Sequence, residues 1–189
     1  MGGRQMRPTE ILMEEHRVIE RVLTALEKAA SRLSRGEDVY LRFFSGTSTL
    51  INGFNDSYHH KKEEQVLLPV LIENGVPRES PVIATLLGEH EEGRRLAQRL
   101  HQVIDRYMSG DIHARDQVVL CALGYVSLLR RHMYKEDNAL FPLVEKIIPP
   151  EQQKRMLEAF ERFEHEANGA ELHEKYYGMA DRLVQECVR

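Results

Sequence analysis

Histidine and glutamate recur in this sequence at spacings that suit a metal centre built from helices. The chain has 189 residues, nine of them histidine. Two segments, HHKKE and HMYKE, place a glutamate four residues after a histidine, as His59 with Glu63 and His132 with Glu136. Residues four apart share one face of a helix, so each pair presents an imidazole and a carboxylate to the same point. Such mixed ligand sets suit iron, manganese or zinc.

The two pairs belong to a weak internal repeat. Each pair continues to a proline at the same distance, as His59-x3-Glu63-x5-Pro69 and His132-x3-Glu136-x5-Pro142, and the two copies lie 73 residues apart. Chance recurrence of three residue types in one register is improbable. The repeat therefore indicates two equivalent helical segments that contribute to one site.

Four apolar stripes predict the helices that position these residues. Steps of three and four between apolar residues cover 12–33, 44–70, 83–107 and 118–143, and the alternation typical of strands is missing. Glycine- and proline-containing pieces (SRGED, ENGVPRES, SGDIHARD and IIPPEQQ) separate the stripes. We predict an all-α fold: an antiparallel up-down-up-down four-helix bundle over 8–150, with an additional C-terminal helical segment, 151–189, packed on it.

The polar residues on these stripes lie at similar depth in the predicted bundle. Glu63 comes 13 residues before the turn near Val76 and His90 comes 14 after it, so both lie about 20 Å from that turn. Buried imidazoles and carboxylates without partners are costly, and a metal ion compensates them. We predict a metal layer of six side chains: His16, His59, Glu63, His90, His132 and Glu136.

The ligand types favour a pair of iron ions. Neither cysteine, Cys121 or Cys187, lies near the layer, which disfavours a thiolate zinc site. Six side chains exceed the needs of one tetrahedral ion, and carboxylates can bridge two ions. We therefore expect a dinuclear site with iron preferred, and zinc or manganese as substitutes.

The sequence resembles the hemerythrin-like, His-His-Glu cation-binding domains over roughly residues 8–150. The resemblance rests on His16 alone in the first helix, HHKKEEQVLLP in the second, EHEEGR around His90 in the third and HMYKEDNALFP in the fourth. It implies a four-helix bundle with a non-haem, oxo- or hydroxo-bridged di-iron centre that binds or reacts with O2. Members of that family include oxygen carriers, oxygen or iron sensors, and proteins linked to redox or nitric oxide stress.

Two positions depart from the oxygen-carrying hemerythrins. Those proteins have a second histidine one turn after the third-helix ligand, where this chain has Arg94. The fourth-helix carboxylate, Glu136, follows its histidine by four residues rather than five, and Asp137 occupies the later position. The chain is thus more similar to the sensor-like and bacterial branches. Three roles stay open for His60: replacement ligand, hydrogen-bond donor behind the ligands, or solvated neighbour.

Other polar and aromatic residues receive ordinary interpretations. Glu64 and Asp137 are interpreted as surface groups or as outer partners of the ligands. His173 is interpreted as a packed or interface histidine, with a place in the metal pocket as the alternative. Packing is the expected role of Tyr58 and Tyr125, with a hydrogen bond to a bridging oxygen as the alternative. Three histidines need no functional explanation: His101, His113 and His165.

Composition excludes several classes of partner. The net charge is −4, so there is no basic surplus to bind nucleic acid. No apolar run approaches the roughly 20 residues of a membrane span. Acidic residues occupy the N-terminal stretch where a signal peptide would be apolar, and two cysteines make no disulfide framework. We expect a cytoplasmic protein.

The favoured function is a binding protein for O2, or for another small diatomic or peroxide ligand, acting as carrier or as sensor of oxygen, redox state or iron. No motif for a substrate channel or an electron-donor dock is visible, so an enzyme that reduces O2 or peroxide is the alternative. Metal storage or a structural zinc bundle is the third. A homodimer is also considered, with its contact in the fifth segment at four aromatic residues: Phe160, Phe163, Tyr176 and Tyr177.

Overall fold

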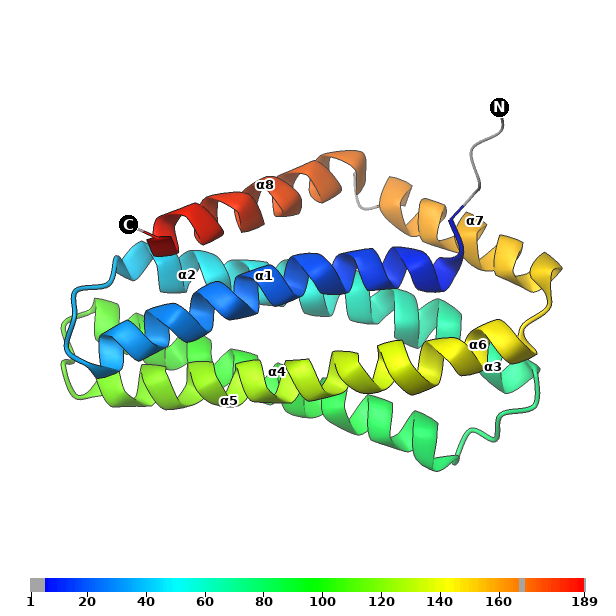
Figure 1. Ribbon diagram of the computed structural model, residues 1–189, viewed down its shortest axis with the longest axis horizontal. Coiled ribbons are helices and arrows are strands. Elements are labelled where there is room, and N and C mark those ends of the chain that lie inside the picture. Colours follow the sequence, from blue (N-terminus) through cyan, green and yellow to red (C-terminus); the bar gives the residue numbers. More distant parts are fainter. Residues whose placement is uncertain (1–5, 167–168, 189) are drawn as a thin grey trace.

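The computed structural model describes the backbone of residues 6–166 and 169–188, and the side chains of these ranges except 164–173 and 188. Across these ranges the chain is helical and contains no strand (Figure 1), as the sequence predicts. No described helix is both long enough and apolar enough to cross a membrane. The interpretations of His165 and His173 lie outside the described side chains.

Four long helical stretches carry the apolar stripes. The first and third are single helices, α1 (Pro8–Ser34) and α4 (Pro81–Met108). The second runs without a break through α2 (Leu41–Leu50), η1 (Ile51–His60), η2 (Glu63–Leu67) and α3 (Leu68–Glu73). The fourth runs through α5 (Ala114–Lys135), η3 (Glu136–Leu140) and α6 (Phe141–Ile147). Two further helices follow, α7 (Pro150–Glu166) and α8 (Gly169–Val188).

The helices end at the turn residues that the sequence indicates. Gly36, Gly75 and Gly110 follow α1, α3 and α4 with φ of 76°, 93° and 97°, a left-handed conformation that glycine adopts without steric cost. At the start of α4, the Ser80 hydroxyl accepts a hydrogen bond from the backbone N–H of Ile83, and a proline takes the first helical position. These local signals set the lengths of the stretches.

The repeated His-x3-Glu-x5-Pro spacing corresponds to a repeated π-helical turn. The N–H of Leu68 donates to the carbonyl of Glu63, and the N–H of Phe141 donates to that of Glu136, five residues back in each case. A proline follows each of these donors. Proline has no N–H and its ring clashes with the carbonyl four residues back, so a wider turn at this point relieves the conflict. Each candidate glutamate ligand therefore begins a widened turn, η2 or η3.

A buried polar layer divides the apolar core into two clusters. On α1, Leu12 belongs to one cluster and Ile19 to the other, and His16 lies between them. The same order recurs on α4 around His90. The predicted site residues thus occupy one level of the fold, as the depth argument requires.

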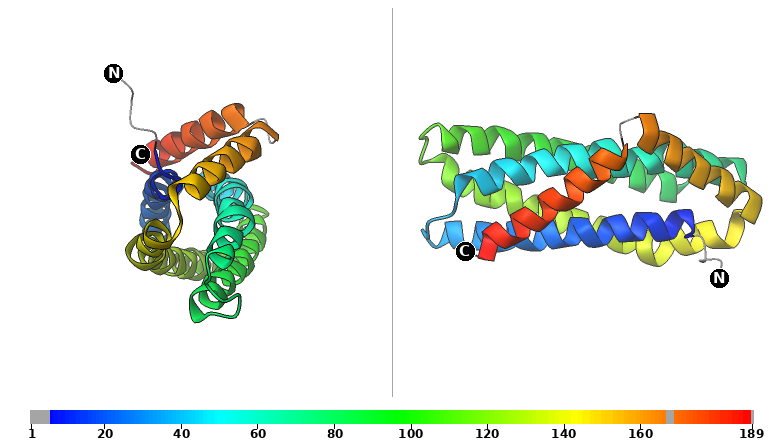
Figure 2. Two further views of the ribbon diagram at one scale, coloured as in Figure 1. Left: turned by 90° about the vertical axis from the view of Figure 1, so that its right-hand side faces the viewer. Right: turned by 90° about the horizontal axis from the view of Figure 1, so that it is seen from above.

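The last two helices pack on α1 and on the second stretch. α8 contacts α1 and α2, and α7 contacts α1 and η2 (Figure 2). Glycine makes the close approach of α8 possible: a Cβ on Gly53 would lie 2.1 Å from the hydroxyl oxygen of Tyr176, and one on Gly46 would lie 3.0 Å from a methyl carbon of Leu183. The two glycines that interrupt the second apolar stripe are thereby explained.

The aromatic residues of the fifth segment contribute to the core of the same chain. Phe160 is 1% exposed, and Phe163, Tyr176 and Tyr177 are partly buried against the two apolar clusters. The rings of Tyr176 and Tyr177 both contact Phe54. Packing within the chain accounts for these side chains, so they give no support to the expected dimer contact, which stays a prediction.

Candidate metal centre

Five imidazoles and two carboxylates gather in the polar layer. All six side chains selected from the sequence are there, and His60 joins them as a seventh. Each is at most 4% exposed. They come from every one of the four long stretches: His16 from α1, His59, His60 and Glu63 from the second stretch, His90 from α4, and His132 and Glu136 from the fourth.

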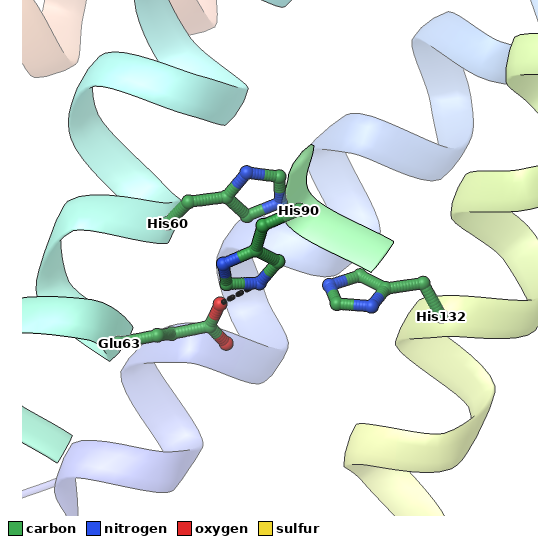
Figure 3. A group of neighbouring side chains, drawn as sticks. All are labelled: His60, Glu63, His90 and His132. Carbon is green, nitrogen blue, oxygen red and sulfur yellow. Dashed lines mark ion pairs between the residues drawn. The ribbon is translucent and has the colours of Figure 1, made fainter. Parts of the chain in front are cut away.

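The first group that could hold a metal ion consists of His60, Glu63, His90 and His132. One ligand atom of each lies within 4.8 Å of the corresponding atoms of the other three. Figure 3 shows these side chains turned toward one another, with the ion pair between Glu63 Oε2 and His90 Nε2 at 3.2 Å. The His60 ring stacks on the His90 ring with centroids 3.9 Å apart.

The second group consists of His16, His59, Glu63 and Glu136, under the same 4.8 Å limit. The Nε2 atoms of His16 and His59 approach to 3.0 Å, so both nitrogens face the same small space. Two neutral imidazole nitrogens that face one another can share either a proton or a metal ion.

The two carboxylates lie between the groups. Glu63 directs Oε2 toward His90 and Oε1 toward His59, whose Nε2 is 3.6 Å away. Glu136 directs Oε1 toward the Nε2 of His132 at 3.1 Å, and Oε2 toward the Nε2 of His16 at 3.2 Å. Each carboxylate therefore offers one oxygen to each group. Three imidazoles lie on one side of the pair and two on the other.

Several of these inward-facing atoms have no hydrogen-bond partner among the described residues. They are both oxygens of Glu63, both oxygens of Glu136, and the Nε2 atoms of His90 and His132. Their ion-pair contacts within the layer, at 3.1 to 3.6 Å, lack the geometry of a hydrogen bond, and metal ions would supply the missing partners. A donor set of buried carboxylate oxygens and imidazole nitrogens that lack other partners fits two transition-metal ions.

Each imidazole has an outer carboxylate at its Nδ1 atom. For four of the five the contact is a hydrogen bond, which fixes the ring so that Nε2 faces inward and favours the tautomer with the proton on Nδ1. In contrast, His60 Nδ1 forms no hydrogen bond among the described residues. The five pairs are His16 with Asp137 (2.8 Å), His59 with Glu15 (2.8 Å), His60 with Asp56 (3.6 Å), His90 with Glu64 (2.7 Å) and His132 with Glu89 (3.2 Å).

Sequence reasoning found two of these partners and missed three. Glu64 and Asp137 are outer partners of the histidines, which is one of the two roles expected for them. Glu15, Glu89 and Asp56 were not predicted. A signal was present in four of the five cases. Each of these four acids neighbours a candidate ligand in the sequence and serves a histidine on another helix, as Glu15 beside His16 serves His59.

Arg94 lies behind the site and links two outer carboxylates. Its Nη1 is 3.1 Å from Asp56 and 3.0 Å from Glu64, which are the partners of His60 and His90. Of the three roles left open for His60, the solvated neighbour is wrong, because its side chain is 2% exposed. Its Nε2 has one long contact, 3.4 Å to the amide nitrogen of Asn55.

A fully buried lysine supports the outer carboxylate of His59. Lys62 is 0% exposed, and its ammonium donates to Glu15 at 2.5 Å while lying 3.9 Å from the centre of the Tyr58 ring. Tyr58 thus packs on a cation. Tyr125 is buried too, and its hydroxyl accepts a hydrogen bond from Asn55. Packing explains both tyrosines, as expected, and Lys62 was not anticipated.

Neighbouring carboxylates raise the pKa values of His16 and His90, so these two imidazoles stay protonated when no metal is bound. Burial lowers the pKa of His16, but its contacts with Asp137 and Glu136 outweigh burial and raise the pKa to about 10. Burial also lowers the pKa of His90, but its contacts with Glu63 and Glu64 outweigh burial and raise the pKa to about 9. At neutral pH both rings carry a positive charge that offsets the buried carboxylates.

Metal binding is therefore expected to strengthen as the pH rises. An imidazole must lose a proton before Nε2 can ligate a metal, and the raised pKa values mean that His16 and His90 are protonated below about pH 9. Apparent affinity should rise about tenfold per pH unit for each proton released. Competition with a chelator of known pH dependence between pH 6 and 8.5 measures this. An affinity that does not change across this range would contradict it.

Comparison with known proteins agrees with these motifs. The family model of the hemerythrin HHE cation-binding domain matches residues 7–144. Uncharacterized proteins of Mycobacterium bovis and of two strains of Mycobacterium tuberculosis are 27% identical over 160 residues, which cover 85% of this chain. The match spans 62% of the length of each relative. No solved structure matches the chain. The family match covers most of the sequence, and the chain belongs to the hemerythrin HHE cation-binding domain family.

Proposed function

We propose that this chain holds a dinuclear non-haem iron centre through which it binds O2 or senses oxygen, redox state or iron. The proposed metal ligands are His16, His59, His60, Glu63, His90, His132 and Glu136. The observation that carries the proposal is the position of Glu63 and Glu136, each with one oxygen toward each group of histidines. Carboxylates so placed suit two ions that share their ligands.

Iron is proposed because of the donor set. Five imidazoles and two carboxylates exceed what one tetrahedral zinc ion takes, and no cysteine is among the seven side chains. Zinc or manganese could substitute in vitro. A pair of ferrous ions would supply the electrons that O2 or a peroxide accepts when it binds.

The chain's own residues orient and isolate the site. The outer carboxylates hold the imidazole rings, and the two apolar clusters exclude water on either side of the layer. The group with His16 and His59 has one imidazole fewer than the other, so it leaves more room for an external ligand. We propose that O2, or another small diatomic or peroxide ligand, binds there.

We also propose the architecture predicted from the sequence as the frame of this function. Residues 8–150 would form an antiparallel up-down-up-down four-helix bundle, and 151–189 a helical extension that closes one side of it. The contacts of α7 and α8 with α1 and the second stretch support this division.

Anaerobic iron loading followed by exposure to O2 tests the proposed function. We expect about two irons per chain and new ultraviolet-visible charge-transfer absorption once O2 is admitted. Reversal of that absorption on deoxygenation favours binding, and sustained turnover of added peroxide favours the enzymatic alternative. One tightly held zinc per chain, with no uptake of iron, would contradict the dinuclear model.

A further inference from the structure

One cation is enclosed beside the metal layer although it is not a candidate ligand. Lys62 is 0% exposed, and no other lysine or arginine among the described side chains is buried. An ammonium group has only donors, so it does not ligate a metal ion. Burial of a charged group is costly and requires a partner. The place of Lys62 in the core therefore calls for a role other than ligation.

One carboxylate links Lys62 to His59. The Nζ atom of Lys62 donates to Oε1 of Glu15 at 2.5 Å, and Oε2 of Glu15 lies 2.8 Å from Nδ1 of His59. On the far side of the His59 ring, Nε2 faces His16 and Glu63. A continuous row of contacts thus joins the ammonium to the second group of candidate ligands.

The Glu15 carboxylate differs from the other four outer carboxylates in its burial. Its side chain is 2% exposed, whereas the other four are 18–32% exposed: Asp137, Asp56, Glu64 and Glu89. The cations that pair with three of these four are open to solvent as well, Arg94 at 36% and Lys135 at 51%. Water and salt screen such pairs, but they do not reach the pair of Lys62 with Glu15.

Two aromatic rings enclose the ammonium. Lys62 Nζ lies 3.9 Å from the ring centre of Tyr58 and 5.4 Å from that of Phe160, and both rings are buried. Phe160 belongs to α7, so the helix that packs outside the four long stretches also covers Lys62. In this apolar surrounding the contact between ammonium and carboxylate is stronger than the same contact would be in water.

We propose that Lys62 is a positioning residue for the metal ion of the second group: it holds the Glu15 carboxylate against His59 Nδ1 and so directs His59 Nε2 to the ion. This inference rests on the proposed metal centre and concerns the group at which we place O2. Without the ammonium, Glu15 would be a buried carboxylate that has lost its cation, which is costly, and its hold on the His59 ring would weaken. The first group does not include His59, so its ion should keep its affinity.

Anaerobic titration of metal-free Lys62→Met with ferrous iron tests the proposal. Methionine keeps an apolar stem and removes the ammonium. We expect one ion to bind as in the unsubstituted protein and the other about 10–100-fold more weakly. Lys61→Met is the matched control, because it is the same substitution at the next residue, which is exposed. It should bind both ions with unchanged affinity.

A measurement on the metal-free protein separates this inference from the proposed metal centre. Long-range proton–nitrogen NMR reports which ring nitrogen of His59 carries the proton. We expect Nδ1 in the unsubstituted protein and in Lys61→Met, and a mixture of both tautomers in Lys62→Met, because the contact with Glu15 favours the Nδ1 proton. This change of tautomer in a protein that takes up no iron would contradict the metal centre while supporting the action of Lys62 on His59.

Addition of Glu15→Gln to Lys62→Met completes the test. The double variant removes both buried charges, and its amide oxygen still accepts a hydrogen bond from His59 Nδ1. It should bind the second ion at least about tenfold more tightly than Lys62→Met does.

Circular dichroism establishes which of these variants fold. If Lys62→Met does not fold, a folded double variant that binds both ions supports the proposal, because the need for Lys62 then arises from Glu15. A folded double variant without the second ion would overturn it. Unchanged affinity for both ions in Lys62→Met, with the His59 proton still on Nδ1, would overturn it as well.

Discussion

Replacement of Glu63 by alanine is expected to reduce the metal content from about two ions per chain to well below one. Glu63 is the residue shared by both candidate groups, and its two oxygens face His59 and His90. Its loss therefore removes a ligand from both ions at once. Glu63→Gln should also lose metal but less completely, because the amide nitrogen cannot act as a ligand while one oxygen remains. Metal analysis after dialysis against a weak chelator measures the effect.

The metal-free Glu63→Ala variant should remain folded. The carboxylate is 0% exposed and pairs with His90, whose pKa it raises, so removing it relieves the desolvation of one charge while the buried His90 ring loses its proton. A cooperative urea unfolding transition of the metal-free variant, together with loss of metal, would separate a ligand from a structural residue. Unfolding of the variant would argue that Glu63 has a packing role instead.

Glu64→Gln is the matched control for this experiment. Glu64 is the next residue, and it contacts Nδ1 of His90 rather than facing the centre. Loss of such an outer partner weakens metal affinity by about 10–100-fold without removing a ligand. Near-complete loading of Glu64→Gln at saturating metal is therefore expected. Loss of both ions in this variant, to the same extent as in Glu63→Ala, would contradict the assigned roles.

The helices and most of the site could be predicted because their signals are local. Glycine and proline mark the turns, apolar periodicity marks the buried faces, and the His-x3-Glu spacing puts two potential ligands on one face. The same spacing also contains the proline that widens each turn after Glu63 and Glu136. The π-helical geometry itself was not predicted, since only the backbone hydrogen bonds reveal it.

The role of His60 could not be predicted from the sequence for a related reason. In an α-helix its side chain would be rotated by about 100° from that of His59, onto a different face. The wider turn of η1 reduces this rotation, so two successive histidines both reach the buried layer. The partners of the imidazoles were harder still. Glu15 pairs with His59 across 44 residues, and periodicity within one helix carries no information about such a contact.

His60→Ala is expected to lower the metal content from about two ions per chain to about one. His60 is one of three imidazoles in its group, and the second group of His16, His59, Glu63 and Glu136 does not include it. The ion held with His90 and His132 should therefore be lost first. Lys61→Ala is the matched control, because Lys61 is the next residue and is exposed. It should retain both ions.

Addition of Arg94→His to His60→Ala should restore the second ion. Residue 94 follows His90 by one turn on the same face of α4, the position at which the oxygen-carrying hemerythrins have a histidine. The substitution also removes the guanidinium that links Asp56 and Glu64, so Arg94→His alone serves as the reference and should keep about two ions. If His60→Ala retains both ions at full affinity, His60 is not a ligand. If it loses one ion and Arg94→His fails to restore it, the two positions are not equivalent, and the extra imidazole of this chain holds its metal in a geometry of its own.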